Sequence, residues 1–323
     1  AAARPGAQGG RWGMSQFLTY AALTSTVAAA IALAASFLFA ALGETMGQRS
    51  GVINLGVDGI MLLSAFGTYY AAIKTGSLAV AVLVGAGIGL VMGVVTAFIS
   101  VTLKAEQGIS GIGIYLFGLG FSDLLFLKLV GTPLPIAEPR SINIPLLDRI
   151  PAIGPMFFKQ SLLTYLAFLL VPVLWFVLKH TTYGMKVRAA GENPTALDAV
   201  GVSVAKIRWS TVLIGCTLAG VAGATLLLYD GIFMENLTQS EGFIAVALVY
   251  FGAWSPVGVM GGSVLYGLAI AVVLEWKSLG IIPLSASDLA ATVPAVITIL
   301  VLLLVARRFR QPAVLGKPYE RGG

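Results

Sequence analysis

Three polar residues that could do chemistry lie inside apolar stretches of the sequence: Asn54, Asp58 and Asp123. Asn54 and Asp58 are four residues apart, so in a helix their amide and carboxyl groups share one face and could hydrogen-bond a polar solute. A charge at membrane depth is costly unless it faces protein or water. The three residues are therefore candidates for a substrate pathway. The alternative is a structural role, in which they satisfy the backbone of a broken helix.

The sequence offers few residues for metal binding or catalysis. His180 is the one histidine and Cys216 the one cysteine, which excludes paired-histidine zinc sites, cysteine clusters and intramolecular disulfides. No nucleophile, base and metal set converges, so we expect no catalytic residue, no metal and no resident cofactor. The chain also has no G-x-x-x-x-G-K-[ST] phosphate loop, the usual cradle for a bound nucleotide.

The composition indicates a membrane protein. Only 11% of the 323 residues are charged, 58% are hydrophobic and the mean hydropathy is +0.93. Soluble domains carry about 25% charged residues, so a water-soluble enzyme, a disordered chain and a nucleic-acid binder are all excluded. The elements that must position the polar residues are therefore membrane-spanning helices surrounded by lipid.

Nine hydrophobic segments are candidates for these helices, since a span needs about 20 apolar residues. They lie at 13–43, 52–73, 75–103, 107–130, 161–178, 209–229, in the two parts of 242–274, and at 289–306. The uncharged run 242–274 is too long for one helix, and Trp254-Ser255-Pro256 divides it. We predict an all-α, polytopic membrane helix bundle with about eight to ten transmembrane segments and at least one broken or re-entrant helix.

Basic residues predict the orientation of the bundle. Five lie in 179–208 and five in the tail from Arg307, and Arg4 and Arg11 precede the first span. Basic loops favour the cytoplasm, so we expect both termini there and the acidic stretch 230–241 outside. An even number of crossings then requires one broken segment, for which 47–58 is the candidate. The predicted units are a disordered N-terminal extension (1–13), a transmembrane domain (14–306, with a cytoplasmic segment at 180–206) and a cytoplasmic C-terminal tail (307–323).

The cytoplasmic segment contains the signals of one short helix. Asn193 is a good N-cap, Pro194 fits the first helical position, and Gly201 is a natural stop. The predicted helix, 194–200, places Leu197 and Val200 on one side as a small apolar knob. We interpret it as a docking element; the alternative is a solvated loop.

This segment, 184–201, together with 218–223, resembles the coupling region of ABC-importer permeases for branched-chain amino acids, simple sugars and nucleosides. Residues 47–59, GQRSGVINLGVDG, resemble the early membrane motif of that class in its nucleoside and simple-sugar variant. Asp58 stands in this motif where glutamate is also common. Residues 251–258, FGAWSPVG, resemble a late motif. The resemblance covers about 42–308, and residues 1–13 match nothing in the family.

The resemblance implies a multi-pass permease subunit of the cell membrane. It would form the pathway for a nucleoside or related small solute, with simple sugars or branched-chain amino acids as alternatives. It implies three partners: a cytoplasmic ATPase that uses ATP, an extracytoplasmic substrate-binding (lipo)protein, and a second permease subunit in a heterodimer. The residues that would couple to the ATPase are Gly184, Arg188, Gly191, Glu192, Asn193, Pro194, Ala196, Leu197, Val200 and Gly201. An ion-coupled secondary transporter is the other function that broken helices and buried aspartates would suit.

Overall fold

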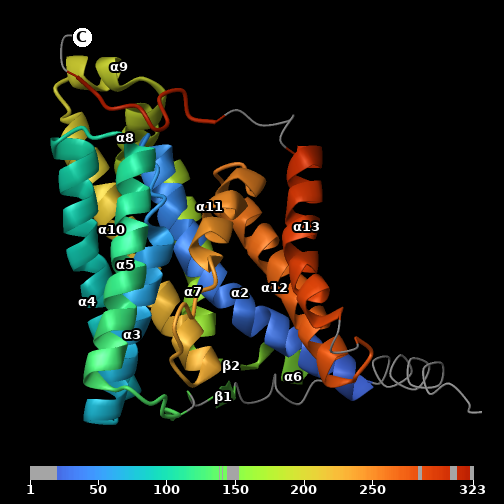
Figure 1. The fold of residues 1–323 in the computed structure, drawn as a ribbon. Coiled ribbons are helices and arrows are strands. Elements are labelled where there is room, and N and C mark those ends of the chain that lie inside the picture. Colours follow the sequence, from blue (N-terminus) through green and yellow to red (C-terminus); the bar gives the residue numbers. More distant parts are fainter. Residues whose placement is uncertain are drawn as a thin grey trace, which may run out of the picture.

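The computed structural model describes residues 20–137, 139, 141–143, 153–282, 286–305 and 311–320, and the statements below concern these residues. The elements are α2 (Tyr20–Arg49), α3 (Val57–Thr75), α4 (Leu78–Ala97) with its π-helical end η1 (Phe98–Thr102), α5 (Gln107–Leu129), β1 (Ser141–Asn143), α6 (Ile153–Phe157), β2 (Lys159–Ser161), α7 (Leu162–His180), α8 (Thr182–Glu192), α9 (Pro194–Ala199), α10 (Val204–Asp230), α11 (Glu241–Phe251), α12 (Pro256–Ser278) and α13 (Ser287–Val305). Figure 1 shows a bundle of helices with one small antiparallel β1–β2 pair at its edge.

Six of the described helices are long and apolar enough to cross a membrane by themselves: α2, α4 with η1, α5, α7, α10 and α12. Helices α3 and α13, of 19 residues each, lie along the same bundle, and α11 is a shorter apolar helix of 11 residues. Together they match the nine predicted segments. The all-α membrane bundle is therefore confirmed, and so is the division of 242–274, because α11 ends at Phe251 and α12 begins at Pro256.

The bundle has two distinct ends. Helices α8 and α9 and residues 311–320 gather at one, which we call the α9 end, and β1, β2 and α6 lie at the other, the β1 end (Figure 1). Helix α2 starts at the β1 end, where Gln160 Nε2 donates to the carbonyl of Ala28 over 3.1 Å, and finishes at the α9 end. The predicted side of Arg4 and Arg11, and the predicted extension 1–13, lie outside the described residues.

Glycine allows the central helices to touch. A Cβ atom on Gly43 of α2 would lie 2.6 Å from the carbonyl oxygen of Gly215 in α10. A Cβ on Gly220 of α10 would lie 2.5 Å from the carbonyl oxygen of Gly85 in α4. Such close backbone approach is typical of membrane bundles, which lack a hydrophobic drive between helices and depend on tight packing.

Two irregular segments interrupt the helices. The first, 50–56, turns the chain from α2 into α3, with Gly51 at a φ of +90°. It confirms that the helix is interrupted within 47–58, but it joins two helices that both run along the bundle. The second, 231–240, belongs to the acidic stretch that is predicted to lie outside. It folds back along α3, because Phe233 and Leu237 are apolar and pack into a buried cluster with Phe66 and Tyr69.

Candidate transport and coupling sites

A buried polar network holds the end of α2 at the first break. Gln48 Nε2 donates to Glu44 Oε2 over 3.1 Å, and Trp254 Nε1 donates to Gln48 Oε1 over 2.9 Å. Arg49 Nε donates to the Trp254 carbonyl over 2.8 Å. Buried polar groups cost free energy unless they are paired, so this network fixes the end of α2 to the turn between α11 and α12.

Asn54 belongs to the turn itself. Its Oδ1 accepts a hydrogen bond from the Gly56 N–H over 2.9 Å, and its Nδ2 donates to Cys216 Sγ over 3.5 Å. The side chain is buried. Asn54 therefore closes a local turn before α3, as asparagine commonly does. The expected common helix face with Asp58 is wrong, because α3 begins only at Val57.

Asp58 joins the first turns of two helices. It is fully buried in α3, and its Oδ1 accepts a hydrogen bond from the Gly242 N–H at the start of α11 over 2.8 Å. The N-terminal end of a helix carries partial positive charge. The Asp58 carboxyl group lies in the first turn of α3 and binds the first turn of α11, so its negative charge stabilises the N-terminal ends of both helices. The Thr238 side chain also interacts with this carboxyl group.

Asp123 lies apart from these two residues, on α5 and nearer to the β1 end. Its carboxyl group accepts a hydrogen bond from the backbone N–H of Asn236 in the second irregular segment. One oxygen, Oδ1, is buried without a hydrogen-bond partner among the described residues. The structure thus places Asn54 inside the first break and Asp58 directly after it, and it places Asp123 beside 231–240. The sequence analysis did not select the polar residues of that segment.

The short helix predicted in the cytoplasmic segment is confirmed as α9. Asn193 Oδ1 accepts from the Ala196 N–H over 3.0 Å, and Pro194 occupies the first helical position. Gly201 has a φ of +80°, and its N–H donates to the Asp198 carbonyl over 2.9 Å. The helix ends at Ala199, one residue before the predicted end.

The apolar knob predicted from Leu197 and Val200 is confirmed for Val200 and wrong for Leu197. Leu197 is only 6% exposed and packs in a cluster with Ala190, Val204 and Tyr319, whereas Val200 is 74% exposed. Val200, the residue directly after α9, is therefore the exposed apolar side chain at this helix, and Leu197 holds α9 in place. Of the ten predicted coupling residues, Arg188, Glu192, Asn193, Ala196, Val200 and Gly201 are exposed, and Gly184, Gly191, Pro194 and Leu197 are buried.

Two glycines seat α8 directly on the membrane helices. A Cβ atom on Gly184 would collide with the carbonyl of Val177 in α7, and one on Gly191 would collide with the carbonyl of Arg49 at the end of α2. No other residue type fits at such distances without a shift of the backbone. The segment that carries α9 therefore touches the first helix break.

The C-terminal tail ties the same parts together. The Val314 N–H donates to the Gly191 carbonyl, and the Gly316 N–H donates to the Gly51 carbonyl, each over 3.0 Å. Arg208 Nη1, at the start of α10, donates to a third point of the tail, the Lys317 carbonyl, over 2.9 Å. The sequence analysis described this tail only by its charge. Its contacts join non-local backbone groups, which no local pattern reveals.

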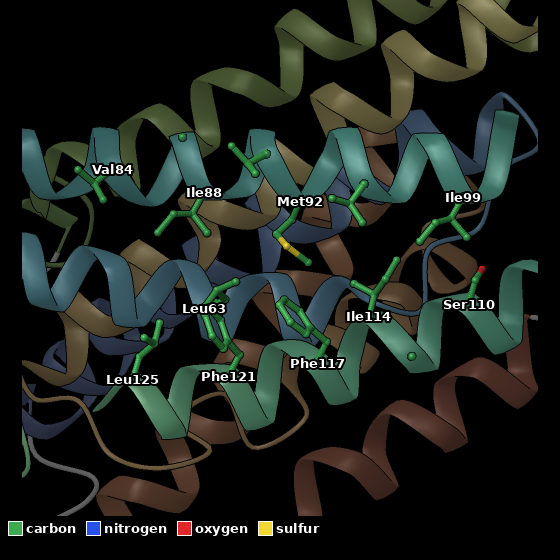
Figure 2. Close-up of a pocket in the computed structure, with 14 residues that line it drawn as sticks. Leu63, Val84, Ile88, Met92, Ile99, Ser110, Ile114, Phe117, Phe121 and Leu125 are labelled. Carbon is green, nitrogen blue, oxygen red and sulfur yellow. The ribbon is translucent and has the colours of Figure 1, made fainter. Parts of the chain in front are cut away.

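An apolar groove lies on another face of the bundle. Figure 2 shows it between α4 and α5, with Leu63 of α3 at its floor. Its volume is about 1050 Å³ and Ser110 is the one lining residue with a polar side chain. A polar solute would lose hydrogen bonds there. The lining residues are Leu63, Val84, Gly87, Ile88, Val91, Met92, Val95, Ile99, Ser110, Gly113, Ile114, Phe117, Phe121 and Leu125.

Taken together, long apolar helices, two breaks inside the bundle and a capped short helix at one end define a multi-pass membrane transporter domain. Residues 26–305 match the family model described as branched-chain amino acid transport system / permease component. The chain belongs to this family of permeases. In the described part of the chain, no group of three or more His, Cys, Asp or Glu residues could hold a metal ion.

Several named relatives cover most of the chain. A provisionally named glucose ABC transporter permease protein, TsgC13 of Haloferax volcanii, is 37% identical over 80% of this chain and 78% of its own. The nucleoside ABC transporter permease protein NupC of Lactococcus lactis is 33% identical over 87% and 92%. The guanosine ABC transporter permease protein NupQ of Bacillus subtilis is 30% identical over 93% and 98%. No solved structure matches the chain.

Proposed function

We propose that this permease carries a nucleoside across the cell membrane and is driven by a separate ATPase that binds at the α9 end. The observation that carries the proposal is α9 itself: a capped helix that presents Val200 outward and is seated through Gly191 on the end of α2. Relatives named for a nucleoside and for guanosine support the substrate class. The relative named for glucose makes a simple sugar the second candidate.

In this proposal the partners divide the work. The ATPase binds and hydrolyses ATP, in keeping with the absence of a G-x-x-x-x-G-K-[ST] motif from this sequence. A substrate-binding (lipo)protein delivers the solute at the β1 end, and a second, different permease subunit completes the pathway. A displacement of α9 would be transmitted to the first break through the contact between Gly191 and Arg49. It would be transmitted further to the α11–α12 turn through the hydrogen bond between Arg49 and Trp254.

The orientation follows from charge. The α9 end carries the basic segment 179–208 and residues 311–320, so it faces the cytoplasm. Helix α2 then starts on the outer side, so this orientation does not agree with a cytoplasmic N-terminus followed by a single span over 13–43. In a Cys216→Ser background, Glu235→Cys should react with an impermeant thiol reagent in intact cells. Thr195→Cys should react only after permeabilisation, and the reverse pattern would invert the orientation.

Uptake of labelled guanosine by cells that contain the full complex tests the function. We expect excess unlabelled nucleoside to compete, and glucose or leucine not to compete. Uptake should stop when the P-loop lysine of the partner ATPase is replaced, and it should survive an ionophore that collapses ion gradients. Uptake that is lost with the ionophore and needs no ATPase would instead show an ion-coupled secondary transporter.

A further inference from the structure

The irregular segment 231–240 lies at membrane depth. It follows α3 from Tyr69, where Phe233 packs, to Asp58, which binds the Gly242 N–H. Asp58 lies 17 residues before the end of α3, which is about 26 Å at 1.5 Å per residue. Asp123, the neighbour of this segment in α5, lies six residues from the end of its helix, or about 9 Å. The segment therefore runs from about 9 Å to about 26 Å inside these helix ends, which reaches past the middle of a hydrocarbon core of about 30 Å.

The exposed residues of this segment are mostly polar. Phe233, Leu237 and Thr238 are buried against the bundle, and the side chains on the open side are Met234, Glu235, Asn236, Gln239 and Ser240. Irregular backbone and polar side chains are not found in contact with lipid at this depth; they occur where they face protein or water. The open side of the segment must therefore face an aqueous passage or a second subunit.

The backbone of the segment is held in an unusual conformation. Asn236, Gln239 and Ser240 have φ values of 54°, 43° and 72°. Residues with a Cβ atom rarely adopt this left-handed region, and they cluster at functional sites where they do. The conformation turns Asn236, Gln239 and Ser240 outward while Leu237 and Thr238 stay in the bundle.

Helix α5 and the start of α11 extend this polar surface. Tyr115 and Phe243, both half-buried, form an edge-to-face ring pair with centroids 5.1 Å apart. Asp123 lies eight residues after Tyr115 on α5, about 12 Å further along the helix and rotated by about 80°. Its side chain is part-exposed and its carboxyl group accepts a hydrogen bond from the Asn236 N–H, which joins α5 to the open side of the segment. We call the set Tyr115, Asp123, Glu235, Asn236, Gln239, Ser240 and Phe243 the polar strip.

We propose that the polar strip is the solute-binding face of this permease and that it takes a solute with a planar ring and several hydroxyl groups, such as a nucleoside. Exposed ring surface at Tyr115 and Phe243 suits a base. The carboxylate of Asp123 and the amides of Asn236 and Gln239 suit ribose hydroxyl groups, which both donate and accept. The proposal rests on the proposed transport function, and it moves solute contact away from Asn54 and Asp58, which are buried and hydrogen-bonded within the chain.

The strip can be tested by removing side chains while the backbone is kept. Asn236→Gly and Gln239→Gly delete the amides and retain the left-handed conformation, which glycine adopts freely. Asp123→Asn keeps the size of the side chain. We expect each variant to raise the KM for guanosine uptake by about tenfold, the effect of one lost hydrogen bond to a charged or polar group. Phe117→Ala, in the apolar groove, is the matched control and should leave the KM unchanged.

Protein folding is monitored separately by thermal unfolding of the purified complex. Unchanged KM values in folded strip variants would overturn the proposal, and so would a loss of assembly without a KM change in the fraction that assembles. If the wild-type complex takes up glucose and not guanosine, the proposed nucleoside substrate fails instead. In that case the KM for glucose is measured in the same variants: a raised KM would support solute contact at the polar strip, and an unchanged KM would contradict it.

Cysteine labelling supplies a second readout. In a Cys216→Ser background, Gln239→Cys should react with a small hydrophilic thiol reagent, and excess guanosine should slow the reaction severalfold. Phe117→Cys should stay unreactive, because a thiol in lipid does not ionise. An inert Gln239→Cys, or one that guanosine does not protect, would show that the strip does not face the solute passage.

Discussion

Replacing Val200 by aspartate separates docking from folding at the α9 end. Val200 is 74% exposed in the chain, so Val200→Asp should change the free energy of unfolding by less than about 0.5 kcal/mol. A valine buried by a partner contributes about 1.5–3 kcal/mol. Its loss should therefore weaken ATPase binding by roughly tenfold to more than a hundredfold.

Leu197→Asp is the contrasting variant. Leu197 is buried against Ala190, Val204 and Tyr319, and removal of a buried leucine side chain costs about 2–5 kcal/mol even without the added charge. This substitution should also stop coupling, but through loss of α9 and lower thermal stability of the complex. The two variants therefore give the same loss of coupled hydrolysis with different stabilities.

Two assays decide between these outcomes. Pull-down of the ATPase and solute-stimulated ATP hydrolysis in reconstituted membranes report docking, and thermal unfolding of the purified permease reports folding. Arg188→Ala and Glu192→Ala are milder controls, since exposed ion pairs contribute only about 0–1 kcal/mol. Normal ATPase affinity and normal stimulated hydrolysis in Val200→Asp would refute the assignment of α9 as the docking element.

Three further predictions follow from individual contacts. Asp58→Leu leaves the Gly242 N–H unpaired and should cost about 1–3 kcal/mol of stability, whereas Asp58→Asn keeps an acceptor; equal losses in thermal unfolding would contradict this role. Gly191→Ala forces a Cβ against the Arg49 carbonyl, should cost about 1–3 kcal/mol, and should lower the uptake per ATP hydrolysed. Hydrogen bonds from backbone N–H groups hold the pKa of Glu106 below its usual 4.5, so its stabilisation of the start of α5 should be lost as the pH falls through that lowered pKa. Hydrogen exchange in the first turn of α5 should show this acid dependence, and Glu106→Gln should lack it.

The elements that could be predicted are those with local signals. Apolar runs located the nine long or apolar helices of the bundle, and Trp254-Ser255-Pro256 located the end of α11. The capping residue Asn193 and the stop at Gly201 were sufficient for α9, because a helix boundary depends on the few residues around it. The apolar runs also gave the fold class, since a membrane permits few other solutions.

The parts that could not be predicted depend on distant segments. Leu197 is buried because Val204 and Tyr319 cover it, and Tyr319 comes from the tail. The packing of residues 231–240 against α3 was not predicted, because the sequence analysis used only their acidic charge. Their one available signal, Phe233 and Leu237 at a spacing of four, is typical of a face that packs against protein. Asn54 and Asp58 fit one helix face by spacing, yet the turn before Val57 separates them.

Helix α11 connects the two proposed sites. The turn that follows α11 is held at the α9 end, where Trp254 forms hydrogen bonds with Gln48 and Arg49. The first turn of α11 is held by Asp58, beside the polar strip. Eleven helical residues form a rod of about 16 Å, and left-handed residues flank it on both sides, with Ser240 before it and Trp254 after it. A stiff helix between two unusual turns moves as a unit more readily than it bends. A displacement of the end of α2 by a docked ATPase would therefore be carried along α11 to the residues that we propose hold the solute.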